Sequence, residues 1–592
     1  MMLPLIDASG GSRDFIDSFG GYHHTDRCRE NESFDEKNIS SDVFPNLSPR
    51  EPRVVFKTVT NCKGLHVNDG LVEIKKDTQG DGTALFYEGT KIRSLTGNAK
   101  RQMCSMGAYV IIWPDKIRFN TKTGEAEDLT STWTSSGNVS FQMCKIDGST
   151  ISPTVSSTAP SNPSPGQYWI DTSTTPNALK TWSQSQGQWL PVATSYTKIS
   201  ATNIGRDFEK MDVVKISGVT GTYASTFNTD MCIWDKSNDS IIVTALINQT
   251  FTKTGITVKR EPPDLDYICE HGNRIWGCSS QNHEIYACKL GDPKNWRSYL
   301  GTTEDSYTAT VGTDGDFTGC AEQGGTVVFF KETHIHKLYG NYPSNYQIEA
   351  KPERGCQKGC ASSIKLINGL LIYKAVDGVC IYEGSFPRLL SSNLGRERYK
   401  DATAGVWNDK YYIVMTNEAT NVRSLFVYDI KANIWHIEDT QIDFDFFINH
   451  KNRLMFYDGT RILAEDRNTK IGDTTYSQDG STLSWMWESG IIGLDSPATK
   501  YISQLVIRMS MELGSTLNIE LEYDSSGEWE KKGSIENNYE ISRRNTQGYT
   551  KLRSIELPII PRRCDHMRIR LSGNGMTTIF SISKRIEQGG LI

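Results

Sequence analysis

The sequence predicts an all-β chain in which a β-propeller of five to seven blades is interrupted by an insertion of small β domains and followed by a C-terminal β-sandwich. Three observations support this prediction. Pairs of apolar strands recur at a nearly constant period, strictly alternating strands fill the C-terminal region, and convincing amphipathic helices are scarce. A chain of 592 residues is also too long for one hydrophobic core and should divide into several domains.

The repeating unit is an apolar strand, a polar turn and a second strand that ends on Tyr, Gly or Asp. Its first strands begin near Val327, Leu370, Tyr411 and Leu454. These starts are 43, 41 and 43 residues apart. Short strands repeated every ~40–45 residues are typical of propeller blades. We therefore expect the main blades in residues 263–470 and the first blade or blades in residues 56–130.

Two upstream copies of the unit fit the period less closely. They lie in residues 108–124 and 274–296. The gap from Tyr109 to Arg274 is 165 residues, which corresponds to one blade plus about 120 inserted residues. The propeller is therefore expected to be interrupted after its first blade.

Residues 269–301 concentrate cysteine, tryptophan and histidine, which fits either a metal or catalytic site or a hairpin with an aromatic core. Its large side chains fall where a blade packs on its neighbours: Trp276, Ile285, Tyr286 and Trp296. Asp292 and Asp429 form equivalent turns, each followed by a tryptophan. This parallel favours the hairpin.

The insertion divides into two expected modules. Residues 131–195 hold a Ser/Thr/Pro-rich linker and a small β module with the tryptophans Trp169, Trp182 and Trp189. These tryptophans either form the core of a unit too small for an ordinary one or, if exposed and coplanar, form a platform for sugar stacking. Residues 196–262 are expected to form a small barrel.

Residues 475–592 are expected to form the sandwich, because their strands alternate with a period of two. The strand "HMRIRLS" (566–572) places three apolar residues on one side and three polar residues on the other. The apolar side comprises Met567, Ile569 and Leu571, and the polar side comprises His566, Arg568 and Arg570.

Residues 1–55 read as an extended N-terminal arm with little periodic hydrophobicity. Its isolated aromatic anchors are Phe15, Phe19, Tyr22, Phe34 and Phe44. The arm is expected to lie along its own propeller or to cross to a neighbouring subunit. We expect it to pack on other β domains and favour contacts with the next subunit of a ring. Deletion of residues 1–40 should then leave a folded monomer and impair assembly.

The net charge of −6 does not favour bulk attraction to nucleic acid or anionic membranes. Residues 541–592 hold ten Lys or Arg and three Asp or Glu, a net +7, so residues 1–540 carry −13. The basic stretch either docks on an acidic neighbour or is a solvated strand face; its arginines are Arg543, Arg544, Arg562, Arg563, Arg568 and Arg570.

The thirteen cysteines lack the spacing of a small disulfide scaffold and are expected to be mostly reduced. The first residues do not read as a signal peptide, and no apolar run of about twenty residues predicts a membrane span.

Metal and cofactor motifs are weak. Cys356 and Cys360 have a spacing that zinc allows, with His334 and His336 as conceivable partners, but ordinary loop cysteines are favoured because no second pair completes a site. "GTDGDFTG" (312–319) is expected to be a turn rather than a calcium loop. No cofactor, metal or cofactor-binding residue is predicted.

The sequence also predicts no enzyme. It has no nucleophile elbow, phosphate-binding loop or zinc-protease motif. A sialidase-type propeller would need an arginine cluster and a tyrosine nucleophile; the available residues are Arg274, Arg388, Arg396 and Tyr411. Their spacing gives no independent support for such a site, so no catalytic residue is predicted.

The run from "HGNRIWGCSSQNHEIYACKLGDPKNW" (271–296) to "THIHKLYG" (333–340) resembles tail proteins of bacteriophages. The layout of arm, propeller and C-terminal β domain is similar to the tail nozzle of short-tailed phages, also called the tail hub or tail tubular protein B. "PSPGQYWIDTSTTPNALKTW" (163–182) looks like small β modules of phage structural proteins.

This resemblance implies a structural virion protein made in the host cytoplasm, in a homo-oligomeric ring of six copies. The ring would cap the portal–adaptor channel, contact portal and adaptor proteins and tail fibres or spikes, and gate the genomic DNA, which passes without sequence-specific binding. An acidic body suits such a channel wall because each Lys or Arg contact to phosphate would add affinity and hinder sliding. The alternative is a propeller that binds or cleaves carbohydrate at the host surface.

Overall fold

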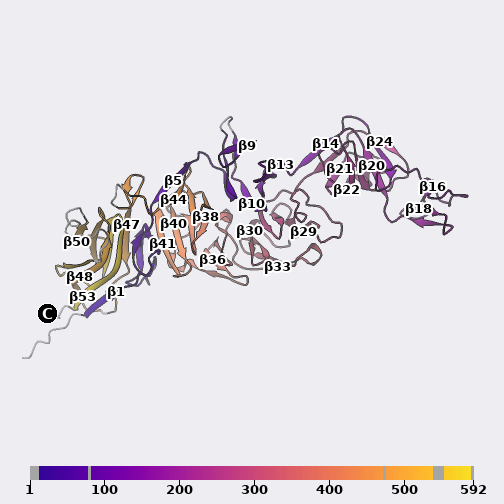
Figure 1. Cartoon of the computed structure of the whole chain (residues 1–592). Coiled ribbons are helices and arrows are strands. Elements are labelled where there is room, and N and C mark those ends of the chain that lie inside the picture. Colours follow the sequence, from indigo (N-terminus) through magenta and orange to yellow (C-terminus); the bar gives the residue numbers. More distant parts are fainter. Residues whose placement is uncertain are drawn as a thin grey trace, which may run out of the picture.

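The computed structural model describes residues 12–588 except 78, 79, 81, 471–474, 496 and 538–552. Its elements are almost all β-strands, as predicted. Figure 1 shows three bodies in a row: a sandwich that contains β1 and β53, a propeller in the middle, and the inserted β domain at the far end. In the described part of the chain, no helix has the length and apolar character needed to cross a membrane.

The propeller has seven four-stranded blades within the described residues. Blade 1 comprises β6 (Gly64–Asn68), β7 (Gly70–Lys76), β8 (Thr83–Tyr87) and β9 (Thr90–Leu95). Blade 2 comprises β10 (Gln102–Met106), β11 (Tyr109–Trp113), β12 (Ile117–Asn120) and β13 (Ala126–Asp128). Blade 3 comprises β26 (Tyr267–His271), β27 (Arg274–Ser279), β28 (Glu284–Ala287) and β29 (Tyr307–Thr310).

The last four blades follow without interruption. Blade 4 comprises β30 (Phe317–Gln323), β31 (Thr326–Lys331), β32 (Ile335–Tyr339) and β33 (Gln347–Lys351). Blade 5 comprises β34 (Lys365–Ile367), β35 (Leu370–Ala375), β36 (Gly378–Tyr382) and β37 (Pro387–Leu389). Blade 6 comprises β38 (Tyr399–Trp407), β39 (Lys410–Asn417), β40 (Arg423–Asp429) and β41 (Ile434–Thr440). Blade 7 comprises β42 (Phe446–His450), β43 (Arg453–Tyr457), β44 (Arg461–Glu465) and β5 (Arg53–Thr58).

The ring closes with a strand from the other end of the chain. The first strands of successive blades lie side by side, and β42 of blade 7 contacts β6 of blade 1. The outermost strand of blade 7 is β5, which pairs with β44 from Glu465↔Arg53 to Arg461↔Thr58. The region predicted as the first blade or blades, residues 56–130, therefore contains two blades and the second half of a strand that completes the last one.

Large aromatic side chains hold neighbouring blades together. Trp276, Ile285 and Trp296 are buried in blade 3, as the hairpin interpretation predicted. The Trp113 indole N–H donates to the Leu265 carbonyl oxygen over 3.0 Å. The tryptophans of this region therefore belong to the hydrophobic cores between blades.

The insert between β13 and β26 contains an eight-stranded sheet in the order β14-β25-β21-β22-β23-β20-β15-β24. Its strands are β14 (Ser131–Thr134), β15 (Val139–Cys144), β20 (Tyr196–Ser200), β21 (Val213–Ser217), β22 (Asp230–Ser237), β23 (Ser240–Thr244), β24 (Phe251–Lys253) and β25 (Thr257–Arg260). The short helix α1 (Ala224–Phe227) packs on its core.

The expected boundary at residue 195 differs from the structure. Strands β14 and β15 come from the first expected module but pair with β25 and β20 of the second. The tryptophan-rich module is a separate sheet set within this domain, made of β16 (Thr154–Ser156), β17 (Tyr168–Asp171), β18 (Ala178–Ser183) and β19 (Gln188–Pro191). It lies at the far end of the molecule (Figure 1).

The sandwich combines both ends of the chain. One sheet has the order β1-β53-β48-β51 and the other the order β2-β47-β52-β49-β50. Its strands are β1 (Ser12–Ile16), β2 (Ser33–Lys37), β47 (Ser484–Ser489), β48 (Lys500–Met511), β49 (Thr516–Tyr523), β50 (Trp529–Glu536), β51 (Arg553–Pro558), β52 (Met567–Asn574) and β53 (Thr577–Gln588). The apolar side predicted for residues 566–572 faces this core.

The N-terminal arm is built into its own chain rather than extended from it. Strands β1 and β2 form one edge of each sandwich sheet. Phe19 packs edge-on against Trp487 with ring centres 5.4 Å apart, whereas Phe15 is 55 % exposed. The expectation that residues 1–40 can be deleted without affecting the fold is therefore wrong, because the deletion removes two strands. A contact with a neighbouring subunit stays a prediction.

Short elements complete the chain. The two-stranded sheets pair β3 (Ile39–Ser40) with β4 (Ser48–Pro49) and β45 (Ser477–Gln478) with β46 (Ser481–Thr482). The 3-10 turns are η1 (Pro343–Asn345), η2 (Ala361–Ser363) and η3 (Ser391–Leu394).

Candidate functional site

The two faces of the propeller differ in what they carry. Strands alternate in direction within a blade, so the turns between second and third strands and the connections between blades lie on one face. The insert leaves the propeller there, between β13 and β26. We call this the insert face. The turns between first and second strands, together with the ends of β44 and β5 that lead to the sandwich, lie on the opposite face.

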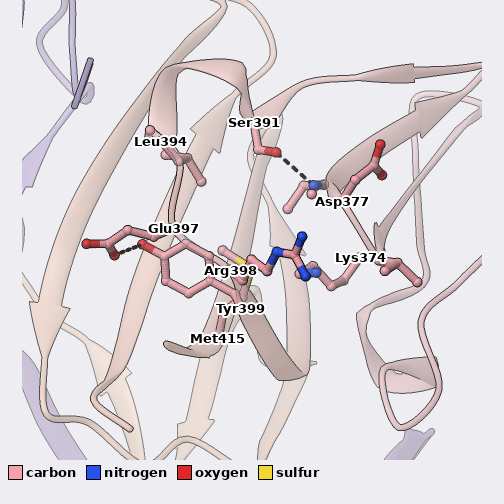
Figure 2. Close-up of a pocket in the computed structure, with 12 residues that line it drawn as sticks. Lys374, Asp377, Ser391, Leu394, Glu397, Arg398, Tyr399 and Met415 are labelled. Carbon is pink, nitrogen blue, oxygen red and sulfur yellow. Dashed lines mark hydrogen bonds between the residues drawn. The ribbon is translucent and has the colours of Figure 1, made fainter. Parts of the chain in front are cut away.

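A small pocket opens on the insert face between blades 5 and 6 (Figure 2). Its volume is ≈ 40 Å³, enough for about one water-sized group. The polar residues that line it come from the end of β35 and the turn after it, from η3, and from the segment that leads into β38: Lys374, Asp377, Ser391, Glu397, Arg398 and Tyr399. The site therefore depends on two blades being packed side by side.

Two cations define the chemistry of the pocket. Lys374 is 1 % exposed, and its ammonium group donates to Gln357 Oε1 over 2.8 Å. Burial lowers the pKa of Lys374. Arg398 extends its guanidinium group into the pocket (Figure 2), where no described side chain forms an ion pair with it. The pocket therefore offers free donors to an anion.

The two carboxylates of the pocket are already engaged. Asp377 pairs with Arg354 over 2.8 Å. Glu397 accepts a hydrogen bond from the Tyr399 hydroxyl over 2.9 Å, and burial raises the pKa of Tyr399. With these carboxylates held by other side chains, the geometry suits the binding of a carboxylate or similar small anion at Arg398.

The residues considered for a sialidase-type site do not come together. Arg274 is buried in blade 3 and donates to the backbone carbonyls of Cys288 and Asp305. Tyr411 is fully buried in blade 6, and its hydroxyl donates to the Ser363 carbonyl over 2.7 Å. Both therefore hold the propeller together. Arg388 lies on β37, and Arg396 precedes β38, and both are exposed.

The candidate metal residues are also held by other contacts. Cys356 and Cys360 are fully buried, and the Cys360 sulfur accepts the Ala402 N–H over 3.3 Å. The His336 ring bonds to the Thr313 hydroxyl over 2.9 Å. Among the residues that the structure describes, no group of three or more His, Cys, Asp or Glu side chains could hold a metal ion. Of residues 312–319, the first five lie in the connection between β29 and β30 and the last three begin β30. Asp316 pairs with Lys358 over 2.7 Å.

The three tryptophans of the small module do not form a flat platform. The ring centres of Trp169 and Trp189 are 5.4 Å apart with an interplanar angle of 63°. Trp182 and Trp189 have the same angle at 5.6 Å. Edge-to-face packing of this kind is typical of a core, so the core interpretation fits the geometry and coplanar stacking does not.

The late basic stretch is partly structural. Arg543 and Arg544 lie outside the described residues. Arg570 pairs with Glu488 over 2.7 Å and lies 3.8 Å above the Trp529 ring. Arg568 lies 3.8 Å above the Phe34 ring. The side chains of these two arginines contact other residues of the sandwich. They therefore fit neither of the two expected roles, a solvated strand face or a docking surface for an acidic neighbour.

The pocket of Figure 2 was not predicted from the sequence, although one signal was present. Lys331 and Lys374 both lie at the end of the second strand of a blade, as the last residue of β31 and the next-to-last of β35. They are 43 residues apart, and both are buried. A lysine that recurs in the apolar strands at the same spacing as the blades indicates a position next to the connection between two blades. Arg398 had no such signal.

No protein-family model matches the sequence, and no curated protein matches it. Among solved structures, the endosialidase of phage phi92 is similar at 10 % identity and a TM-score of 0.22, covering 78 % of this chain and 68 % of that one. An exo-β-1,3-galactanase from Phanerochaete chrysosporium is similar at 10 % identity and a TM-score of 0.19, covering 54 % of this chain and 94 % of that one. Dipeptidyl peptidase 4 of Porphyromonas gingivalis has 9 % identity and a TM-score of 0.27, covering 73 % and 65 %. Likenesses this weak carry no argument about function.

Proposed function

We propose that the protein is a non-enzymatic structural subunit of a phage-type tail, at the nozzle position, where a ring of copies surrounds the path of the genome. The observation that supports this proposal best is that the three bodies of the chain are fastened to one another by buried polar contacts at both joints. A subunit of a tail channel must hold its ends at a fixed separation, and these joints provide that rigidity.

The joint between the sandwich and the propeller is made against β41 of blade 6. The Glu36 carboxylate of β2 lies 3.0 Å from His436 Nδ1, and both side chains are buried. Beside this joint, Arg53 of β5 donates to Glu438 over 2.6 Å, again with both side chains buried, which ties blade 7 to blade 6. Removal of one partner would leave an unpaired buried charge, which costs about 3–5 kcal/mol, so the joint favours one arrangement.

The joint between the insert and the propeller centres on Asn295 of blade 3. Its amide oxygen accepts the Val213 N–H over 3.0 Å, and its amide nitrogen donates to Asp212 over 3.2 Å. Asp212 also pairs with Arg260, both being buried. Lys294 adds a 2.9 Å ion pair to Glu209.

The charge distribution fits the same role. A net charge of −13 over residues 1–540 gives little attraction to DNA, and a channel must let DNA slide. The ring, its six copies and its portal, adaptor and fibre partners rest on the family resemblance and belong to this proposal.

Electron microscopy of purified virions or of the purified full-length chain tests the proposal. The expected result is a ring of this chain on the tail axis with the propeller at mid-length. A chain that stays monomeric at all concentrations and occurs away from the tail axis would overturn it.

A second candidate function is recognition of an acidic glycan on the host surface by the pocket of Figure 2. The unpaired Arg398 favours it, because a guanidinium group binds a carboxylate through two parallel hydrogen bonds. A glycan array should then show binding of sialylated or uronate-containing glycans by the wild type, loss of binding in Arg398→Ala, and unchanged binding in Arg396→Ala, whose side chain does not line the pocket. Equal binding by both variants would exclude this site.

A further inference from the structure

A second, larger pocket lies on the opposite face, between blades 6 and 7. We call it the blade 6–7 pocket. It is formed by the β38–β39 turn, the β42–β43 turn, the end of β44 and two residues of the N-terminal segment. Its volume is ≈ 380 Å³, within the range of about 300–1,000 Å³ that is usual for small-molecule sites.

The charged groups of this pocket form pairs with one another. Lys410 pairs with Asp42 over 2.6 Å. Arg467 pairs with Glu51, and Arg453 lies 4.0 Å from Asp466. Three cations and three anions therefore cancel, which leaves little net attraction for a charged ligand.

Two polar groups of the pocket have no partner among the described residues. One is the carboxyl group of Glu465, at the end of β44. The other is the hydroxyl of Tyr412, a residue only 3 % exposed. Both residues line the pocket and neither group is engaged within the described chain, so both are available to a ligand that enters.

Both groups are uncharged near neutral pH. Burial raises the pKa of Glu465 to about 8, and the neighbouring Glu438 and Asp42 carboxylates act in the same direction. The Arg53 and Arg50 guanidinium groups oppose this shift without cancelling it. Burial raises the pKa of Tyr412 well above its usual value. Each then presents an O–H that can donate and an oxygen that can accept.

The remaining lining is suited to a polar but uncharged molecule. Trp407 is half-buried and contributes a flat aromatic surface. The amide side chains of Asn408, Asn452 and Asn468 line the same pocket. A sugar ring combines an apolar face of C–H groups, which packs on an aromatic ring, with hydroxyls that donate and accept hydrogen bonds.

We propose that the blade 6–7 pocket binds one neutral pyranose unit of a glycan, which stacks on Trp407 and hydrogen-bonds to Tyr412 and Glu465. This site is independent of the acidic-glycan candidate, because the two pockets lie on opposite faces. It is also independent of the nozzle proposal, because ring formation is measured separately.

The test uses the full-length chain and two neutral trisaccharides, maltotriose and chitotriose, with sialyllactose as the charged probe. Saturation-transfer NMR and calorimetry at pH 6.5 and pH 9 measure binding. We expect at least one neutral probe to bind at pH 6.5 and to bind more weakly at pH 9, where Glu465 loses its proton and becomes an acceptor alone. Sialyllactose should not compete.

Four variants locate the site. Trp407→Ala should weaken binding by more than about tenfold, and Tyr412→Phe, which removes one hydroxyl, by about fivefold. Glu465→Gln keeps a neutral donor and acceptor, so it should retain binding at pH 6.5 and lose the weakening at pH 9. Trp189→Ala, in the distant tryptophan-rich module, should bind like the wild type.

Three outcomes would overturn the proposal. They are failure of both neutral probes to bind the wild type, binding that is unchanged in Trp407→Ala and Tyr412→Phe, and binding that Trp189→Ala abolishes. Circular dichroism of each variant confirms that a loss of binding does not come from a loss of fold.

Discussion

The joint between the sandwich and the propeller contains the fully buried Glu36–His436 contact, and the buried Arg53–Glu438 ion pair between blades 7 and 6 lies beside it. The contacts across the joint between the insert and the propeller are instead hydrogen bonds of Asn295 and a partly exposed ion pair. Arg53 also lies 4.6 Å from the centre of the Phe456 ring and 5.2 Å from that of Phe444. At the insert joint, Lys294 pairs with Glu209, which is largely exposed. The charged groups at the sandwich joint are therefore enclosed by the core of the propeller, whereas those at the insert joint are partly in contact with solvent.

The topology explains the difference. Arg53 begins β5, the strand that closes the propeller ring, so the Arg53–Glu438 ion pair beside the sandwich joint also helps to hold the ring closed. The insert leaves the ring between two complete blades and can be released without opening any sheet. We expect damage at the first joint to destabilise the whole molecule and damage at the second to free the insert alone.

The largest effect is expected for Arg53→Met. Loss of the guanidinium group leaves the Glu438 carboxylate buried and without its ion-pair partner, which should lower the free energy of unfolding by about 3–5 kcal/mol. Denaturant unfolding followed by circular dichroism measures this. Arg388→Met, on the exposed outer strand of blade 5, is the control and should change stability by less than about 0.5 kcal/mol. Equal stability of the two variants would contradict the proposed importance of this joint.

Phe19→Ala tests the part of the arm that lies within the sandwich. Phe19 is 3 % exposed, so its truncation should cost about 3–4 kcal/mol. Phe15→Ala is a matched control four residues away, and its largely exposed ring should contribute less than about 0.5 kcal/mol. Thermal unfolding of both variants measures the difference. A similar small effect in both would restore the extended-arm interpretation.

Asn295→Ala tests the insert joint. Loss of the amide leaves the Val213 N–H without its acceptor and should cost about 1–2 kcal/mol, confined to the insert. Hydrogen exchange should accelerate in residues 131–260 and stay unchanged in blades 4 to 7. Asn341→Ala, at an exposed turn of blade 4, should leave both regions unchanged. Faster exchange throughout the propeller would show that the joints are not independent.

The sequence was sufficient to predict the part of the propeller in which paired strands are neighbours along the chain. The second and third strands of each of blades 4 to 7 form a regular hairpin, so their period was visible. The number of blades stayed between five and seven because the fourth strand of the last blade, β5, comes from the start of the chain. No local pattern records a pairing such as Glu465 with Arg53.

The arm and the pockets were not predictable for the same reason. Phe15 and Phe19 are both isolated aromatics in a polar segment, and only the pairing of β1 with β53 decides which one is buried. Lys374 and Arg398 form one pocket because blades 5 and 6 stack, and Tyr412 meets Glu465 because blades 6 and 7 stack. Sequence reasoning identified the strands but not the contacts between them.

The smallest expected effect is a pH dependence of the free energy of unfolding that comes from Glu465, at the end of β44 and next to the sandwich joint. Its pKa is raised to about 8 in the folded protein and is about 4.3 when unfolded. The folded state therefore binds more protons between these values, so the free energy of unfolding falls as the pH rises from 4.5 to 8. The pocket is open to solvent, which reduces the effect to about 1 kcal/mol.

Denaturant unfolding at several pH values should show this decline in the wild type and a flatter profile in Glu465→Gln. If the free energy of unfolding declines identically in the wild type and in Glu465→Gln, other groups cause the decline. The protonated state of Glu465, on which the proposed binding of a neutral sugar depends, would then lack support.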